Sequence, residues 1–302
     1  MVVTCTNRKT TPVLPPLRLG SIPGRTIAES ARAWIARISG SADASPLRAA
    51  DLYAGEHWMV ARRLSAIAVE HDIRLWVCSA GYGLIPVTAP IRPYSAAFSG
   101  QSDRVPGGAD GARRWWQALA GWEGPEPGQA RSIRELAATD QSASFLLALS
   151  ATYLDACRDD ITAAVRELPD PDRFLVVSAG ARDTGSLAGL MVPTDARLQA
   201  VLGGTRQALN ARIAARLLEA GITSRAEATR YMAELLAGQP PVPRYERKKL
   251  SDEEVTAMIA GRLAQAPGMS ASRMLREVRD AGYACEQQRF AGLHRQVAGG
   301  GR

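Results

Sequence analysis

The chain has 302 residues, of which 46% are hydrophobic and 22% are charged, a composition typical of folded globular proteins. Basic residues outnumber acidic ones by 37 to 30, which points to a polyanionic partner or to a general preference for arginine. The apolar runs are too short for a bilayer-spanning helix, and the first residues lack the pattern of a secretory signal. These features exclude an integral membrane protein and predict a soluble cytoplasmic one.

The sequence predicts neither a metal ion nor a cofactor. Its four cysteines and three histidines are widely spaced, without a Cys-x-x-Cys pair, which argues against a zinc site. The apolar runs around Cys5 and Cys78 are typical of buried free thiols. The glycine motifs of ATP-binding and dinucleotide-binding proteins and the serine motif of hydrolases are also absent.

Three short, β-branched runs predict buried parallel strands, at residues 1–5, 73–78 and 174–178. Amphipathic stretches between and around them predict helices at residues 26–38, 55–71 and 140–168. This alternation predicts an α/β fold, with a central, mostly parallel sheet flanked by helices, over residues 1–237. Residues 101–170 are expected to form a helical and loop insertion, in which Trp115, Trp116 and Trp122 either pack between helices or stack on bases.

The C-terminal quarter of the chain has a different composition. Residues 238–250 are proline-rich and basic and predict a linker. Residues 251–302 predict three helices, the first beginning with the capping box Ser251 and Glu254. Their lengths resemble a helix-turn-helix module that binds DNA.

Small polar residues follow each predicted strand. Thr6 and Asn7 follow the first, Ser79 and Gly81 the second, and Ser178 the third. Because parallel strands present their carboxyl ends at one edge of the sheet, Asn7, Ser79 and Ser178 are expected to converge on one site, although such residues also suit ordinary turns.

Aromatic and basic residues near the second strand suggest recognition of a base. Tyr82 lies between two glycines, and Arg92 and Tyr94 flank a proline. These residues are expected either to sandwich a nucleobase or to form turns.

A glycine turn and two charged residues are further candidates. Gly203 and Gly204 with Arg206 precede a helix and resemble a phosphate cradle. Asp195 either caps a helix or faces the site. Lys9 is the only lysine among the first 247 residues, and is either a solvated surface residue or an amine nucleophile.

Several segments of the chain resemble a known family. VTCTNRK (3–9), ADLY (50–53), CSAGYGLIP (78–86) and PIRPYSAAF (90–98) resemble the N-terminal half of the α/β family related to the peroxide-stress protein YaaA. Residues 192–218 and 269–297 extend the similarity, which reaches anti-phage DNA glycosylases that excise glucosylated 5-hydroxymethylcytosine. The basic cluster that usually follows the first cysteine in that family is here Thr6–Lys9, which departs from its pattern.

The resemblance implies a DNA glycosylase that hydrolyses the N-glycosidic bond of a flipped-out modified base in double-stranded phage DNA. Asp195 is then the first candidate for the catalytic carboxylate and Asp51 the second, with Asn7 beside them. The residues expected to contact the base are Thr6, Ser79, Gly81, Tyr82, Arg92, Tyr94 and Ser178. The residues expected to contact DNA are Lys9, Gly203, Gly204, Arg206, Lys248, Lys249, Arg273, Arg276 and Arg289. A non-catalytic DNA-binding protein, and an enzyme that exchanges bases, are the alternatives, and the sequence leaves the oligomeric state open.

Overall fold

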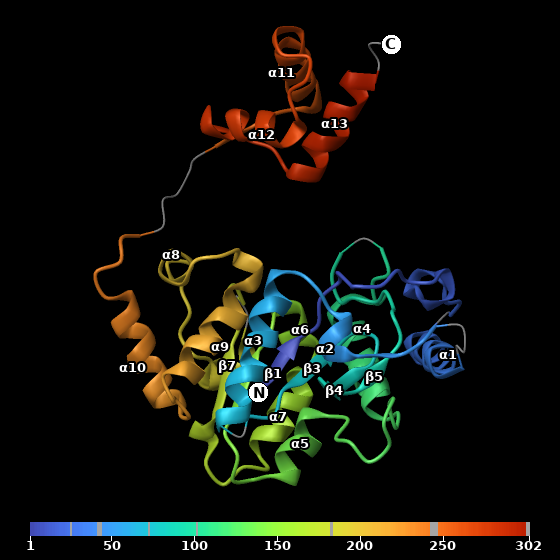
Figure 1. Ribbon diagram of the computed structural model, residues 1–302, viewed down its shortest axis with the longest axis vertical. Helices are drawn as coiled ribbons and strands as arrows, with labels where there is room; N and C mark the ends of the chain where they lie inside the picture. Colours follow the sequence, from blue (N-terminus) through green and yellow to red (C-terminus); the bar gives the residue numbers. More distant parts are fainter. Residues whose placement is uncertain are drawn as a thin grey trace. The chain divides into compact units, whose positions relative to one another are not determined.

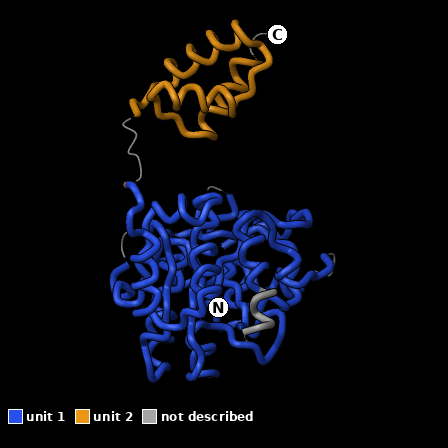
Figure 2. The backbone as a smooth tube through the Cα atoms, turned by 60° about the vertical axis from the view of Figure 1, so that its left-hand side comes forward, with its two compact units in different colours: residues 1–240 blue, residues 241–302 orange. Residues whose placement is uncertain are grey.

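The computed structural model describes residues 1–24, 26–40, 44–71, 73–100, 102–181, 184–241 and 247–299. The chain divides into two compact units, Met1–Pro240 and Pro241–Arg302 (Figure 2). Each unit has its own hydrophobic core. The division lies inside the 238–250 segment expected to be a linker, of which residues 242–246 are outside the described ranges.

A five-stranded sheet forms the centre of the first unit (Figure 1). Its strand order is β4-β3-β1-β6-β7, and every pair is parallel except the antiparallel pair β3 and β4. The strands are almost completely buried, which explains why they are continuous apolar runs without alternation. Their bounds are β1 Val2–Thr4, β3 Trp76–Ser79, β4 Gly83–Pro86, β6 Phe145–Ala148 and β7 Phe174–Val177.

The mostly parallel sheet is flanked by helices, which confirms the predicted fold class. The expected helices at 26–38 and 55–71 are α1 (Ile27–Gly40) and α3 (Glu56–His71). Helix α3 packs on α9, α4 packs on α1 and α6, and α5 packs on α7. The other helices are α2 Ala49–Leu52, α4 Gly108–Ala120, α5 Ile133–Thr139, α6 Ala151–Ala156, α7 Arg158–Val165, α8 Leu198–Leu202, α9 Leu209–Glu219 and α10 Arg225–Leu236.

Short elements connect these helices and strands. Strand β2 (Leu47–Arg48) pairs with β5 (Pro90–Ile91) in an antiparallel arrangement. The 3₁₀ turns are η1 Pro15–Leu17, η2 Leu19–Ser21, η3 Pro171–Arg173, η4 Gly185–Leu190 and η5 Arg206–Ala208.

The prediction of a continuous helix over 140–168 is wrong. Phe145–Ala148 form β6, which lies between β1 and β7. Within residues 140–168, the first helix is α6, which begins after this strand. The sequence Phe-Leu-Leu-Ala suits a helix as well as a strand, so its pattern alone does not distinguish them. Residues 101–170 therefore contribute an interior strand to the sheet.

The tryptophans of α4 pack inside the first unit. Trp115 and Trp116 are buried, and their Nε1 groups donate to the Ala80 carbonyl oxygen at 2.7 Å and to the Asp160 carboxylate at 2.9 Å. Trp122 packs against the ring of Tyr82. Helix packing is therefore the interpretation that the structure favours for these rings.

The second unit contains three helices and a short parallel pair of strands. Helix α11 (Asp252–Gln265) begins with the predicted capping box of Ser251 and Glu254. Helices α12 (Ala271–Asp280) and α13 (Gln287–Gly299) follow, and β8 (Lys248–Lys249) pairs with β9 (Tyr283–Ala284). No helix in the described ranges is both long and apolar enough to cross a membrane.

Candidate functional site

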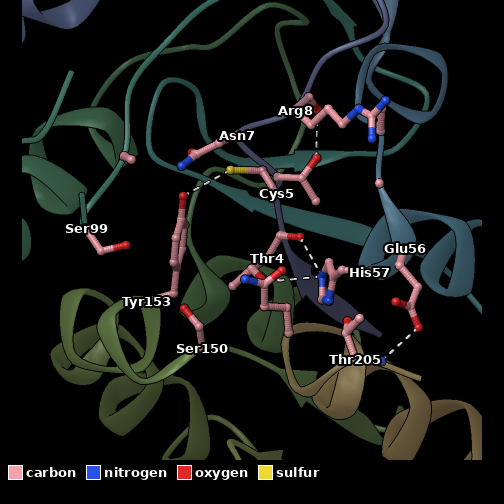
Figure 3. A pocket seen from close by; sticks show the side chains of 15 residues that line it. Thr4, Cys5, Asn7, Arg8, Glu56, His57, Ser99, Ser150, Tyr153 and Thr205 are labelled. Carbon is pink, nitrogen blue, oxygen red and sulfur yellow. Dashed lines mark hydrogen bonds between the residues drawn. The ribbon is translucent and has the colours of Figure 1, made fainter. Parts of the chain in front are cut away.

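A cavity of about 520 Å³ lies where β1 and β6 end (Figure 3). From β1 the chain reaches β3 on one side, and it later returns to β6 and β7 on the other. Open α/β sheets bind ligands at the carboxyl ends of the two neighbouring strands from which the chain continues in opposite directions, here β1 and β6. Most of the lining residues have polar side chains, and the lining consists of Thr4, Cys5, Thr6, Asn7, Arg8, Ala54, Gly55, Glu56, His57, Ala97, Ser99, Ser150, Tyr153, Thr205 and Gln207.

The segment after β1 supplies one wall of this cavity. The Cys5 thiol lies 3.0 Å from the hydroxyl of Tyr153 on α6, as Figure 3 shows. Burial raises the pKa of Tyr153 well above its ordinary value, so this hydroxyl stays protonated. Thr6 and Asn7 come next and also line the cavity, as expected from the sequence.

A carboxylate lies at the first turn of α3. Glu56 Oε1 accepts hydrogen bonds from Arg212 Nη2 at 2.8 Å and from the Thr205 amide at 3.1 Å. The side-chain hydrogen bond from Arg212 is the main cause that lowers the pKa of Glu56, followed by the bonds from Thr205. Glu56 is therefore an anion at neutral pH, and it lines the cavity.

The next residue of α3, His57, is within hydrogen-bonding distance of the end of β1. Its Nε2 lies 3.1 Å from the Thr4 carbonyl oxygen and 3.3 Å from the Thr4 hydroxyl. Burial lowers the pKa of His57, so the ring is neutral at physiological pH. A neutral ring that donates its Nε2–H to the Thr4 carbonyl fixes the first turn of α3, and hence Glu56, beside the end of β1.

The residues expected to sandwich a base are buried beneath the surface. Ser79 Oγ lies 2.7 Å from the Tyr94 hydroxyl and accepts the amide of Tyr82 at 2.9 Å. Tyr82 and Tyr94 are 2% and 0% exposed, so neither ring has a face open to a base. A Cβ atom on Gly81 would lie 2.4 Å from the Tyr94 ring, which shows that this glycine is needed for packing.

Arg92 and Ser178 also lie outside the cavity lining. The Arg92 guanidinium donates to the Ile38 carbonyl at 3.2 Å, and Ser178 is 1% exposed. The expected convergence of Asn7, Ser79 and Ser178 is therefore wrong, since of these three only Asn7 lines the cavity. Ser79 and Ser178, at the ends of β3 and β7, are instead buried and contribute to turns and packing.

Neither predicted catalytic aspartate lines the cavity. Asp195 forms an ion pair with Arg197 at 3.0 Å, and the hydrogen bonds from Arg197 lower its pKa. Asp51 lies 2.8 Å from Arg48 and 3.7 Å from Arg62. Each of these carboxylates pairs with neighbouring arginines, as Glu56 does with Arg212, but Glu56 lines the cavity and the two aspartates do not.

The turn formed by Gly203 and Gly204, which precedes η5 and α9, lies beside the ion pair of Glu56 and Arg212. A Cβ atom on Gly204 would lie 2.3 Å from Arg212 Nε and 2.4 Å from Glu56 Oε1. The Thr205 amide, which the phosphate-cradle hypothesis would direct at a phosphate, donates to Glu56 instead. Gly204 therefore makes room for the ion pair between Glu56 and Arg212, whereas a Cβ atom on Gly203 would have no neighbour within 4 Å. Gly203 instead supplies the positive φ of 68° that the turn requires. Arg206 is exposed next to the lining residues Thr205 and Gln207.

The basic residues of the second unit differ in what they contact. Arg289 is held internally by the Asp252 carboxylate at 2.6 Å and the Leu250 carbonyl at 2.9 Å, which argues against a DNA contact. Arg273 is exposed and lies 3.9 Å from Glu277. Exposed side chains also include Arg276, Lys248 and Lys249.

Sequence reasoning missed several lining residues. Glu56 lies in the first turn of a predicted helix, directly after Gly55, and this position beside a glycine was the available signal. Ser150 was missed because it follows the unrecognised strand β6. Within the described ranges, no group of three or more His, Cys, Asp or Glu side chains is arranged to hold a metal.

No protein-family model, curated protein or solved structure matches this chain. The resemblance to the YaaA-related family and to DNA glycosylases therefore stays a prediction. The functional proposal depends on the chemistry of the cavity.

Proposed function

We propose that the chain is a DNA glycosylase that hydrolyses the N-glycosidic bond of a base rotated out of the double helix. The observation that carries this proposal is one cavity that is lined by the ionised Glu56, the Asn7 amide and the hydroxyls of Ser99, Ser150 and Thr205. Its volume of about 520 Å³ lies within the range of small-molecule sites.

The polar lining supports recognition of a nucleotide. The Asn7 side chain offers both a donor and an acceptor, which the edge of a base requires. The hydroxyl groups of the lining can form hydrogen bonds with the oxygens of a sugar. A base that carries an added hexose, as glucosylated 5-hydroxymethylcytosine does, presents many such oxygens.

Glu56 supports the chemical step. Cleavage of a glycosidic bond passes through an oxocarbenium-like transition state, which a nearby carboxylate stabilises. Water attacks C1′ and transfers a proton to Glu56, while the C1′–N bond breaks and its electron pair leaves with the base, which then takes up a proton. The hydrogen bonds from Arg212 and the Thr205 amide hold the Glu56 carboxylate in place for this step.

The second unit supports a double-stranded DNA partner. Its exposed arginines and lysines suit the phosphate backbone. In the proposed activity this unit holds the duplex, and the cavity selects and releases the base.

The decisive experiment supplies glucosylated phage DNA and the same DNA without the modification. We expect a free modified base, detected by mass spectrometry, and a matching number of abasic sites, detected with an aldehyde-reactive probe. Glu56→Gln should lower the rate about 100-fold or more, because a neutral amide does not stabilise the positive transition state.

Asp195→Asn is the matched control, because it removes a carboxylate outside the cavity and should keep the wild-type rate. Loss of activity in Asp195→Asn, with Glu56→Gln unaffected, would return the acidic role to Asp195. If folded protein binds the modified DNA without releasing base, the chain is a non-catalytic DNA-binding protein. If release requires an added free base, the reaction is base exchange.

A further inference from the structure

The segment that supplies Thr6 and Asn7 to the cavity is attached to the end of α2. The Thr10 amide donates to the Leu52 carbonyl at 2.9 Å, and the Ala54 amide donates to the Arg8 carbonyl at 3.0 Å. Lys9 pairs with Tyr53 between these two bonds. The backbone of residues 8–10 is therefore fixed, whereas residues 6 and 7 form the tip that reaches the cavity.

The side chain of Lys9 folds back onto this tip. Its Nζ donates to the Thr6 carbonyl oxygen and lies 3.4 Å from that of Asn7. The same atom lies 5.0 Å from the ring centre of Tyr53 and 4.6 Å from that of Tyr94. Carbonyl oxygens and aromatic faces both attract a cation, so this environment suits an ammonium group.

The two rings belong to a buried hydrogen-bonded group. The hydroxyls of Tyr53 and Tyr94 lie 2.9 Å apart, and the Tyr94 hydroxyl lies 2.7 Å from Ser79 Oγ. Lys9 therefore contacts both this buried group and the backbone carbonyls of Thr6 and Asn7, two residues that line the cavity.

We propose that Lys9 is a positioning residue, which holds the tip formed by Thr6 and Asn7 so that their side chains face the cavity. Lys9 itself does not line the cavity and acts through Asn7. For its effect on catalysis, this inference rests on the proposed glycosylase function. It also assigns a supporting role to Tyr94 and Ser79, which the sequence analysis placed against the substrate.

The contacts of Lys9 favour its charged form, because carbonyl oxygens and two aromatic faces surround Nζ. An amine nucleophile must be neutral and must reach C1′, whereas Nζ here donates to the Thr6 carbonyl, and Lys9 is not among the residues that line the cavity. The titratable groups that face Lys9 are Cys5 after β1, Tyr53 after α2 and Tyr94 after β5. Burial keeps both tyrosines protonated and lowers the pKa of Lys9, so alkaline pH should neutralise it before an exposed lysine.

The test compares Lys9→Met, an unbranched side chain one atom shorter that removes the donors and the charge, with Lys9→Arg, which keeps a permanent charge. Arg166→Met is the control, because Arg166 is exposed at the end of α7 and outside the cavity lining. Amide hydrogen exchange over residues 5–10 reports on the tip independently of activity. Base release as a function of pH reports on catalysis.

We expect Lys9→Met to speed exchange over residues 5–10 and to lower kcat/KM at least 10-fold, with no such effect in Arg166→Met. We expect wild-type activity to fall at alkaline pH and Lys9→Arg to retain activity at higher pH, because arginine stays charged. Wild-type exchange and kcat/KM in Lys9→Met would overturn the inference. So would an unchanged alkaline limit in Lys9→Arg, which would assign that limit to another group.

These results separate the two proposals. If the wild-type protein releases no base, the glycosylase proposal fails, and the exchange measurement alone decides the role of Lys9. If Lys9→Met does not fold, the pH dependence of Lys9→Arg decides it.

Discussion

Arg212 lowers the pKa of Glu56, the carboxylate that the proposed reaction uses. The guanidinium donates to Oε1 at 2.8 Å and is the main cause that lowers the pKa of the carboxyl group. A lowered pKa means that Glu56 stays ionised as the solution becomes acidic, until the pH falls below the ordinary range for glutamate. The reaction proposed for Glu56 needs this ionised form.

Arg212→Gln should therefore move the acidic limit of base release to higher pH, because Glu56 then takes up a proton more readily. The measurement is the rate of base release from about pH 4 to pH 8. Arg197→Gln is the matched control, since Arg197 pairs with Asp195 outside the cavity and its loss should leave the limit in place. An acidic limit that is the same in Arg212→Gln and the wild type would exclude Glu56 as its origin.

At the scale of elements, α9 fixes the ends of two strands next to the cavity. Asn210, on the buried face of α9, donates to the Leu149 carbonyl after β6 at 2.8 Å and accepts the Ala179 amide after β7 at 2.7 Å. Its amide thus satisfies two backbone groups that the parallel ladder leaves unpaired. Ser150, which lines the cavity, directly follows one of them.

Asn210→Ala should lower the free energy of unfolding by about 2 to 4 kcal/mol, because a buried donor and a buried acceptor lose their partners. Urea denaturation monitored by circular dichroism measures this change. The exposed Gln141→Ala should change stability by less than about 0.5 kcal/mol. A loss in Asn210→Ala no larger than that control would show that water replaces both hydrogen bonds.

At the scale of the whole molecule, the chain combines a unit that contains the cavity with a basic helical unit. In the second unit, Arg247, Arg276 and Arg279 line a hollow of about 370 Å³ together with Ser272, Leu275, Asp280 and Gln287. Several guanidinium groups around one hollow suit a phosphate of the DNA backbone. If the proposed function is correct, α12 and the residues around this hollow are the part of the second unit expected to contact the duplex.

Arg276→Gln should weaken binding to duplex DNA and should reduce by about 1 the slope of log affinity against log salt concentration, because one fewer counterion is released. Fluorescence anisotropy with a labelled duplex at several salt concentrations measures that slope. Arg166→Gln in the first unit removes the same charge and should leave the slope unchanged. Equal slopes for Arg276→Gln and the wild type would remove Arg276 from the DNA interface.

The sequence by itself determined the local features of this protein. Buried β-branched runs identified β1, β3 and β7, and amphipathic spacing identified α1 and α3. The capping box of Ser251 and Glu254 marked the start of α11. Such features depend on neighbouring residues, so a local pattern is enough to predict them. The position of Thr6 and Asn7 at a strand end was predictable for the same reason.

Only the tertiary structure decided which residues share the cavity. Phe145–Ala148 became a strand because β1 and β7 pair with it, and those partners are far away in the sequence. Glu56, rather than Asp195, faces the cavity because α3 presents its first turn to the end of β1 and Arg212 approaches from α9. Tyr94 lies beneath that surface because Tyr53 and Ser79 bind its hydroxyl from other elements. The packing of distant segments determines where a side chain points, and local sequence patterns do not encode it.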